Sequence, residues 1–201
     1  GGKREEAFVI AQSHQEMDEY AKIILQIDER NTEEHLKIAQ FYEGKSMWGK
    51  AAKHYEKCEQ YSKALKLYMS EGENMIPDMI EMVSKVKMEA LTHELVDYLM
   101  GESDNIPKEP QWTFKLYRAI GNVTQAVKIA VNIAQQEQEL GNYKYAHDIL
   151  LDTFKDIKQG NQRIPFELNQ RLLLIHSYQL AKKLVKFGNH MGAARLLIRV
   201  C

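Results

Sequence analysis

A short phrase recurs along the chain and restricts its fold more than any other feature of the sequence. Gly-Asn, three residues and then Ala occur at Gly121…Ala126, Gly141…Ala146 and Gly188…Ala193. Glycine readily adopts the left-handed conformation that ends a helix, and asparagine suits the turn and cap that follow. The small alanine lets two helices approach each other closely. The phrase therefore predicts helix–turn–helix repeats.

A second pattern places a bulky residue three positions before an alanine and another four positions after it. It occurs at Trp48…Ala51…Tyr55, Tyr61…Ala64…Tyr68 and Tyr143…Ala146…Leu150. Residues at these spacings share one face of a helix, so they predict a seam between helices like that of tetratricopeptide repeats. The predicted seam residues are Ala39, Tyr42, Trp48, Ala51, Tyr55, Tyr61, Ala64, Tyr68, Tyr117, Gly121, Ala126, Gly141, Tyr143, Ala146, Gly188 and Ala193.

The repeats are irregular in length. The seam alanines at positions 51, 64, 126, 146 and 193 lie 13, 62, 20 and 47 residues apart, whereas a regular tetratricopeptide array repeats every ~34 residues. We therefore predict an all-α, tetratricopeptide-like solenoid of about twelve antiparallel helices. Caps and breakers place the helices near 4–13, 16–28, 32–44, 47–58, 61–71, 76–86, 89–101, 111–120, 123–140, 143–159, 165–187 and 190–201.

Local signals refine this map. Asn31 followed by Thr32 and two glutamates is typical of a helix start. Pro77, Pro110 and Pro165 each fit the first turn of a helix, where the missing N–H is harmless. The loop 101–110 predicts a hinge within one solenoid segment, 1–201. The apolar stretch 193–201 has no cap, so we expect further helices after it in a longer protein.

Composition excludes several kinds of protein. The chain has only two cysteines, which are too few for a disulfide framework or a four-thiolate zinc site. This count is typical of a reducing, intracellular compartment. No apolar run is long enough to span a membrane. Basic residues interleaved with stacking aromatics, as a nucleic-acid groove requires, are not visible in the sequence.

Charge is unevenly distributed along the chain. Residues 168–201 contain six Lys or Arg and no Asp or Glu, so the part before them carries 21 basic and 28 acidic residues, a net charge of −7. Two interpretations fit this asymmetry. The basic end could bind an acidic partner, or helices beyond it could neutralise it. The second interpretation is favoured.

No catalytic motif has the spacing that chemistry requires. We find no phosphate-binding glycine loop, no HExxH and no nucleophile elbow, so we predict a non-enzymatic chain without cofactor, metal or small-molecule substrate. His176 shares a helix face with Leu172 and Leu180, which predicts a hydrogen-bonded core histidine. His54, His147 and His190 have no partner His or Cys at ligand spacing.

Longer phrases resemble one protein family. They are Phe41-Tyr42-Glu43-Gly44, Gln60-Tyr61-Ser62-Lys63-Ala64-Leu65-Lys66, Leu99-Met100-Gly101-Glu102, Gly141-Asn142-Tyr143 with Ala146-His147-Asp148, Leu174-Ile175-His176-Ser177-Tyr178, Gly188-Asn189-His190-Met191 and Ala194-Arg195-Leu196-Leu197-Ile198-Arg199-Val200. They look like the helical C-terminal half of the WD-repeat subunit of intraflagellar transport complex A known as subunit 144, or WD repeat protein 19. The resemblance runs through most of residues 32–201.

The resemblance implies a scaffold for transport in cilia. Members of the family associate with other complex A subunits, support retrograde transport and help to bring membrane-receptor cargo into cilia. They are found in the cilium or flagellum, at the ciliary base and in the cytoplasm. Their propellers and cysteine-rich zinc-binding elements have no counterpart in these residues, so zinc is not expected here. The alternatives are a vesicle-coat or adaptor solenoid outside cilia, and a ligand-binding or enzymatic domain on a helical scaffold.

Overall fold

The structure, a computed structural model, describes residues 2–14, 16–27 and 31–200. These residues form twelve α-helices and one short 3-10 helix, and they contain no strand. The predicted all-α fold is therefore confirmed. The chain divides into two compact units, Gly1–Ile106 and Pro107–Cys201. The division falls in the loop 101–110, where hinge motion stays a prediction.

The predicted helix boundaries agree with the observed ones to within two residues wherever both fall in the described part of the chain. The predicted helix ends at 28 and 201 lie outside the described residues. No local signal predicted the short 3-10 helix. None of the helices that the structure describes is long and apolar enough to cross a membrane.

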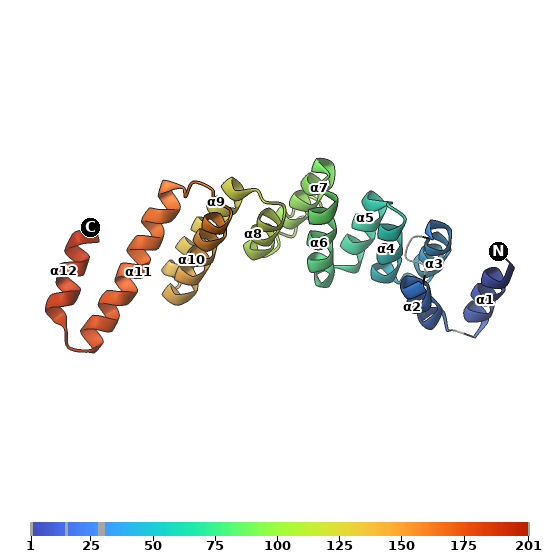
Figure 1. Cartoon of the computed structure of the whole chain (residues 1–201), viewed down its shortest axis with the longest axis horizontal. Helices are drawn as coiled ribbons and strands as arrows, with labels where there is room; N and C mark the ends of the chain where they lie inside the picture. The colour runs from blue at the N-terminus through green and yellow to red at the C-terminus, as the bar shows by residue number, and fades with distance from the viewer. Residues whose placement is uncertain (1, 15, 28–30, 201) are drawn as a thin grey trace. The chain divides into compact units, whose positions relative to one another are not determined.

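The first unit is a series of short helices (Figure 1). Its elements are α1 (Gly2–Ser13), α2 (Met17–Ile27), α3 (Thr32–Gly44), α4 (Trp48–Lys57), α5 (Tyr61–Glu71), η1 (Glu73–Met75), α6 (Ile76–Val86) and α7 (Glu89–Met100). Asn31 caps α3 as predicted, since its side-chain oxygen accepts a hydrogen bond from the backbone N–H of Glu34 at 3.2 Å. Helices α3, α4 and α5 pack side by side.

A tyrosine recurs every 13 residues in these three helices, at Tyr42, Tyr55 and Tyr68. All three rings are buried. Each hydroxyl donates a hydrogen bond to a carboxylate on the preceding helix: Tyr42 to Asp18 (2.7 Å), Tyr55 to Glu43 (2.5 Å) and Tyr68 to Glu56 (3.4 Å). The ring can therefore be buried while its polar end keeps a partner.

Lysines complete two of these contacts. The Lys63 Nζ donates to Glu43 and to the Tyr55 hydroxyl, both at 2.8 Å. This ammonium group and the Tyr55 hydroxyl hold the pKa of Glu43 below its usual range, while burial raises the pKa of Tyr55. Lys50 is the equivalent residue 13 positions earlier, and its Nζ lies 2.7 Å from both carboxylate oxygens of Asp18. Hydroxyl, carboxylate and ammonium thus link consecutive helices.

The second unit contains five helices. They are α8 (Pro110–Ala119), α9 (Val123–Glu139), α10 (Tyr143–Gln159), α11 (Phe166–Lys186) and α12 (His190–Val200). Of these, α9, α10 and α11 are longer than any helix of the first unit. Pro77 in α6 and Pro110 in α8 lie in the first turn, as predicted. Pro165 does not. It is the N-cap of α11, because its backbone is extended, with φ −61° and ψ 140°.

The Gly-Asn phrase forms the same turn three times in this unit. Gly121, Gly141 and Gly188 have φ of 77°, 84° and 78°, the left-handed conformation that the phrase predicts. The asparagines differ. Asn122 and Asn189 accept a hydrogen bond from the backbone N–H three residues later, at 3.2 and 2.8 Å. Asn142 makes no such cap, because its side chain donates to Glu137 instead, at 2.7 Å.

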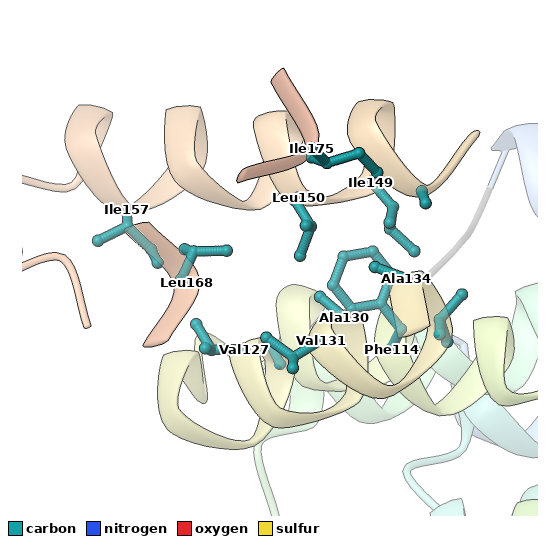
Figure 2. Packing of buried hydrophobic residues seen from close by; sticks show 13 residues of the cluster. Phe114, Val127, Ala130, Val131, Ala134, Ile149, Leu150, Ile157, Leu168 and Ile175 are labelled. Atoms are coloured by element: carbon teal, nitrogen blue, oxygen red, sulfur yellow. The ribbon is translucent and has the colours of Figure 1, made fainter. Parts of the chain in front are cut away.

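The core of the second unit lies between α8, α9, α10 and α11. In Figure 2, Val127 and Val131 of α9 and Leu150 of α10 point toward one another, and the Phe114 ring reaches into the space between them. Ile157, Leu168 and Ile175 extend the same cluster to α11. Ala130 and Ala146 are fully buried where the helices pack. Their small side chains permit this close packing.

The tyrosine contacts of the first unit generate a stability prediction. Tyr55→Phe removes a short hydrogen bond to a carboxylate, so we expect the free energy of unfolding to fall by about 1–2 kcal/mol. Tyr68→Phe removes only the 3.4 Å contact to Glu56, and a loss below about 0.5 kcal/mol is expected. Urea unfolding of both variants measures the difference. Equal losses would contradict the role given to the short contact.

The packing of buried alanines in the second unit generates a second stability prediction. Ala146→Leu adds three carbon atoms at a position with no free space, so it should lower the free energy of unfolding by about 1–3 kcal/mol. Ala194→Leu is the matched control, because Ala194 lies on α12 and is exposed. Denaturant midpoints of the two variants are compared with that of the unmodified chain. An unchanged midpoint for Ala146→Leu would contradict the placement of Ala146 at a tightly packed contact between helices.

Candidate protein-interaction site

The predicted seam residues fall into three environments. Nine of them are buried in the structure: Ala39, Tyr42, Ala51, Tyr55, Ala64, Tyr68, Ala126, Ala146 and Ala193. Four aromatic ones, Trp48, Tyr61, Tyr117 and Tyr143, are half-buried. Gly121, Gly141 and Gly188 are exposed, and a Cβ atom at any of them would meet nothing within 4 Å. These glycines are therefore required for backbone conformation and not for close contact.

Histidines that the sequence left without partners are paired in space. The Nδ1 atoms of His35 and His54 lie 3.0 Å apart, and the Nε2 of His147 lies 3.0 Å from the Nδ1 of His176. His54 and His147 have no partner at ligand spacing in the sequence, but each contacts a histidine that is distant in the chain. Each pair joins two different helices, and its members lie 19 or 29 residues apart in the sequence. No local spacing could have found them.

The two pairs lie in different surroundings. His35 and His54 are buried, and the Tyr42 ring stacks on His54 with 5.9 Å between ring centroids. His147 is nearly buried, whereas His176 is exposed, so the prediction of a core position for His176 is wrong. Within the part of the chain that the structure describes, no three or more His, Cys, Asp or Glu side chains are grouped to hold a metal.

An uncovered apolar surface runs along α11. Phe166, Leu173, Leu180 and Phe187 are spaced seven residues apart, and their exposed fractions lie between 41% and 83%. Seven residues make about two helical turns, so all four lie on one side of the helix. We call these four residues the α11 stripe. Met191 and Ile198 of α12 have the same spacing and are also exposed.

The α11 stripe lies opposite the side of the helix that packs on the core. Leu168 and Ile175 are buried in the cluster shared with α9 and α10. At ~100° per residue, the stripe is turned by more than a right angle from these two residues. A helix with apolar residues on two sides normally packs between neighbours. The sequence carried this signal in the seven-residue spacing, but only the structure shows which side is uncovered.

These features define an α-helical repeat segment with an apolar surface left open, the class to which interaction scaffolds belong. No protein-family model matches the chain. The chain is nevertheless 43% and 42% identical to WD repeat-containing protein 19 of Mus musculus and Homo sapiens, in each case over 97% of its length. It is 36% identical over 98% of its length to WD repeat-containing protein dyf-2 of Caenorhabditis elegans.

The chain is therefore similar, along nearly all of its length, to a segment of WD repeat-containing protein 19, and the predicted resemblance is confirmed. It spans only 15% of the length of the mouse and human proteins, and 14% of the nematode protein. The similarity thus concerns one helical segment of much longer chains.

The buried histidine pair predicts a pH-dependent stability. Burial, His35 and Lys57 lower the pKa of His54 from 6.5 to about 4. Between these values the unfolded chain binds a proton that the folded chain does not, so stability is lost as the pH falls from 6.5 toward 4. The loss from this residue should reach roughly 3 kcal/mol at the acid end.

Thermal unfolding as a function of pH tests this effect. His54→Gln should flatten the decline of the melting temperature in this range, although carboxylates that titrate near its acid end still contribute. The matched control is His93→Gln, which removes an exposed imidazole from α7. If the His54→Gln profile keeps the slope of the unmodified chain, the buried pair is not the source of the pH dependence.

Proposed function

We propose that this segment is a non-enzymatic scaffold of intraflagellar transport complex A, which holds other subunits of that complex along its helical surface. In this role it supports retrograde ciliary transport and the delivery of membrane-receptor cargo into cilia. It acts in the cilium, at the ciliary base and in the cytoplasm. The observation that carries the proposal is the uncovered α11 stripe. The similarity to WD repeat-containing protein 19 supports the choice of complex.

Physical chemistry favours a protein partner for the stripe. Burying a Phe or Leu side chain stabilises a complex by ~1.5–3 kcal/mol, so covering four of them is worth several kcal/mol before ordering costs. The stripe follows the 21-residue helix α11 along one convex side. A small molecule needs a concave pocket to bury most of its surface, whereas another helix can pack along such a ridge.

A capture experiment with paired variants tests the proposal. The tagged chain is used to capture complex A subunits from an extract of ciliated cells. Leu173→Gln combined with Leu180→Gln should reduce capture by about tenfold or more, since two apolar anchors are lost. Glutamine is chosen because it leaves the net charge unchanged beside Lys182 and Lys183.

Leu140→Gln is the matched control, because Leu140 is 73% exposed in the same unit but lies outside the stripe. This variant should capture complex A subunits as well as the unmodified chain does. Failure of the unmodified chain to retain any complex A subunit would contradict the proposal. Location in cells separates the vesicle-coat alternative, which requires the tagged protein at Golgi or endosomal membranes instead of the ciliary base and axoneme.

A further inference from the structure

A groove of about 1040 Å³ lies between the first turn of α10 and the C-terminal half of α11. Lys144 lines it from α10, and Lys182, Lys183 and Lys186 line it from α11. Asp148 is the one acidic residue of its lining. We propose that this groove binds an acidic peptide segment of a partner protein, an inference that rests on the scaffold function proposed above.

The positions of the lysines are unusual for a helical repeat. Leu168, Ile175 and Lys182 are spaced seven residues apart, so Lys182 lies on the side of α11 that packs on the core. Lys186 follows one turn later on the same side. In a helix built only for packing these positions would be apolar. Here the core-facing side changes from apolar to basic where it reaches the groove.

The positive charge of the groove is not neutralised within the described part of the chain. None of its four lysines makes an ion pair there, whereas seven other lysines, from Lys22 to Lys155, do. The single carboxylate, Asp148, is already engaged, since its Oδ1 lies 3.1 Å from the Nδ1 of His147. The first turn of α10, without a side-chain cap on Asn142, adds its partial positive charge. Four ammonium groups beside a single carboxylate, that of Asp148, which already contacts His147, attract a polyanion.

Tyrosines give the groove an apolar floor and hydroxyl donors. Tyr143, Tyr145 and Tyr178 line it, and the Tyr143 and Tyr178 rings pack together with 4.6 Å between centroids. Tyrosine is enriched at protein interfaces because it combines a large ring with a hydrogen-bonding group. Carboxylates of a bound peptide can accept from these hydroxyls and from the lysines, while an apolar peptide side chain rests on the rings.

The walls of the groove are fixed relative to each other. The Gln179 Nε2 donates to the backbone carbonyl of Tyr143 at 2.8 Å, and the His147–His176 contact joins the same two helices one turn further along. A groove held in this way loses little entropy when a peptide binds. Its two sides come from helices far apart in the sequence, so only the fold brings Lys144 to the three lysines of α11.

A protein segment fits this groove better than a nucleic acid. Single-stranded nucleic acids bind to aromatic faces spaced along a basic track. Here Tyr143 and Tyr178 pack against each other, and the lysines of α11 cluster within about two turns. The cluster also accounts for three of the six basic residues of the segment 168–201, which contains no acidic residue.

Peptide binding to the 201-residue chain tests the inference. The probe is a fluorescent peptide of glutamate and aspartate with one central phenylalanine, and its binding is followed by anisotropy at about 0.15 M salt. The unmodified chain should bind it saturably, and Lys182→Glu with Lys186→Glu should weaken binding by about tenfold or more. Lys182→Gln with Lys186→Gln should give an intermediate loss. Thermal unfolding verifies that the variants are folded.

The matched control is Lys128→Glu with Lys158→Glu, which makes the same change in net charge at exposed positions outside the groove. It should weaken binding by less than about threefold. Equal losses in both pairs, or no binding by the unmodified chain, would overturn the inference. Tighter binding of oligothymidine or of phosphatidylserine vesicles at the same lysines would assign the groove to nucleic acid or membrane instead.

The capture experiment with the α11 stripe gives an independent result. If the unmodified chain does not bind the peptide but stripe-dependent capture is retained, only the inference about the groove is refuted. Failure of both refutes the scaffold function as well.

Discussion

The close approach of neighbouring helices at buried alanines is the constraint on which both units depend. Ala51 and Ala64 in the first unit, and Ala130 and Ala146 in the second, have no exposed surface. A larger side chain at any of them would separate two helices and open gaps beside them. In the first unit the same approach brings each buried tyrosine hydroxyl within reach of a carboxylate on the preceding helix. The polar contacts therefore follow from the apolar packing.

Helix positions could be predicted because their signals are local. Gly121 has a positive φ in the turn after α8, and Asn31 caps α3 through its own side chain. Both effects involve residues within a few positions. Asn142 shows the limit of this reasoning. It occupies the same place in the phrase as Asn122, but its side chain donates a hydrogen bond to Glu137, five residues earlier. Such competition depends on side-chain geometry that a repeated phrase does not encode.

The candidate sites were much less predictable, because they join residues from different helices. The histidine pairs bridge 19 and 29 residues, and nothing near His54 in the sequence points to His35. The excess of lysine after residue 168 was visible, but the part played by Lys144 was not. The spacing of Phe166, Leu173, Leu180 and Phe187 predicts an apolar side of α11. Whether a neighbour covers that side depends on the packing of the whole unit.

Helix α11 carries the core contacts, the stripe and one wall of the groove, and its length makes this possible. Over its 21 residues the core-facing side is apolar at Leu168 and Ile175 and basic at Lys182, while the stripe occupies the opposite side. Opposite sides of one helix can be covered at the same time without steric conflict. A partner held along the stripe therefore leaves the lysines free for an acidic segment of the same partner or of a second one. The rigid link from Gln179 to Tyr143 keeps the groove in place whichever side is occupied first.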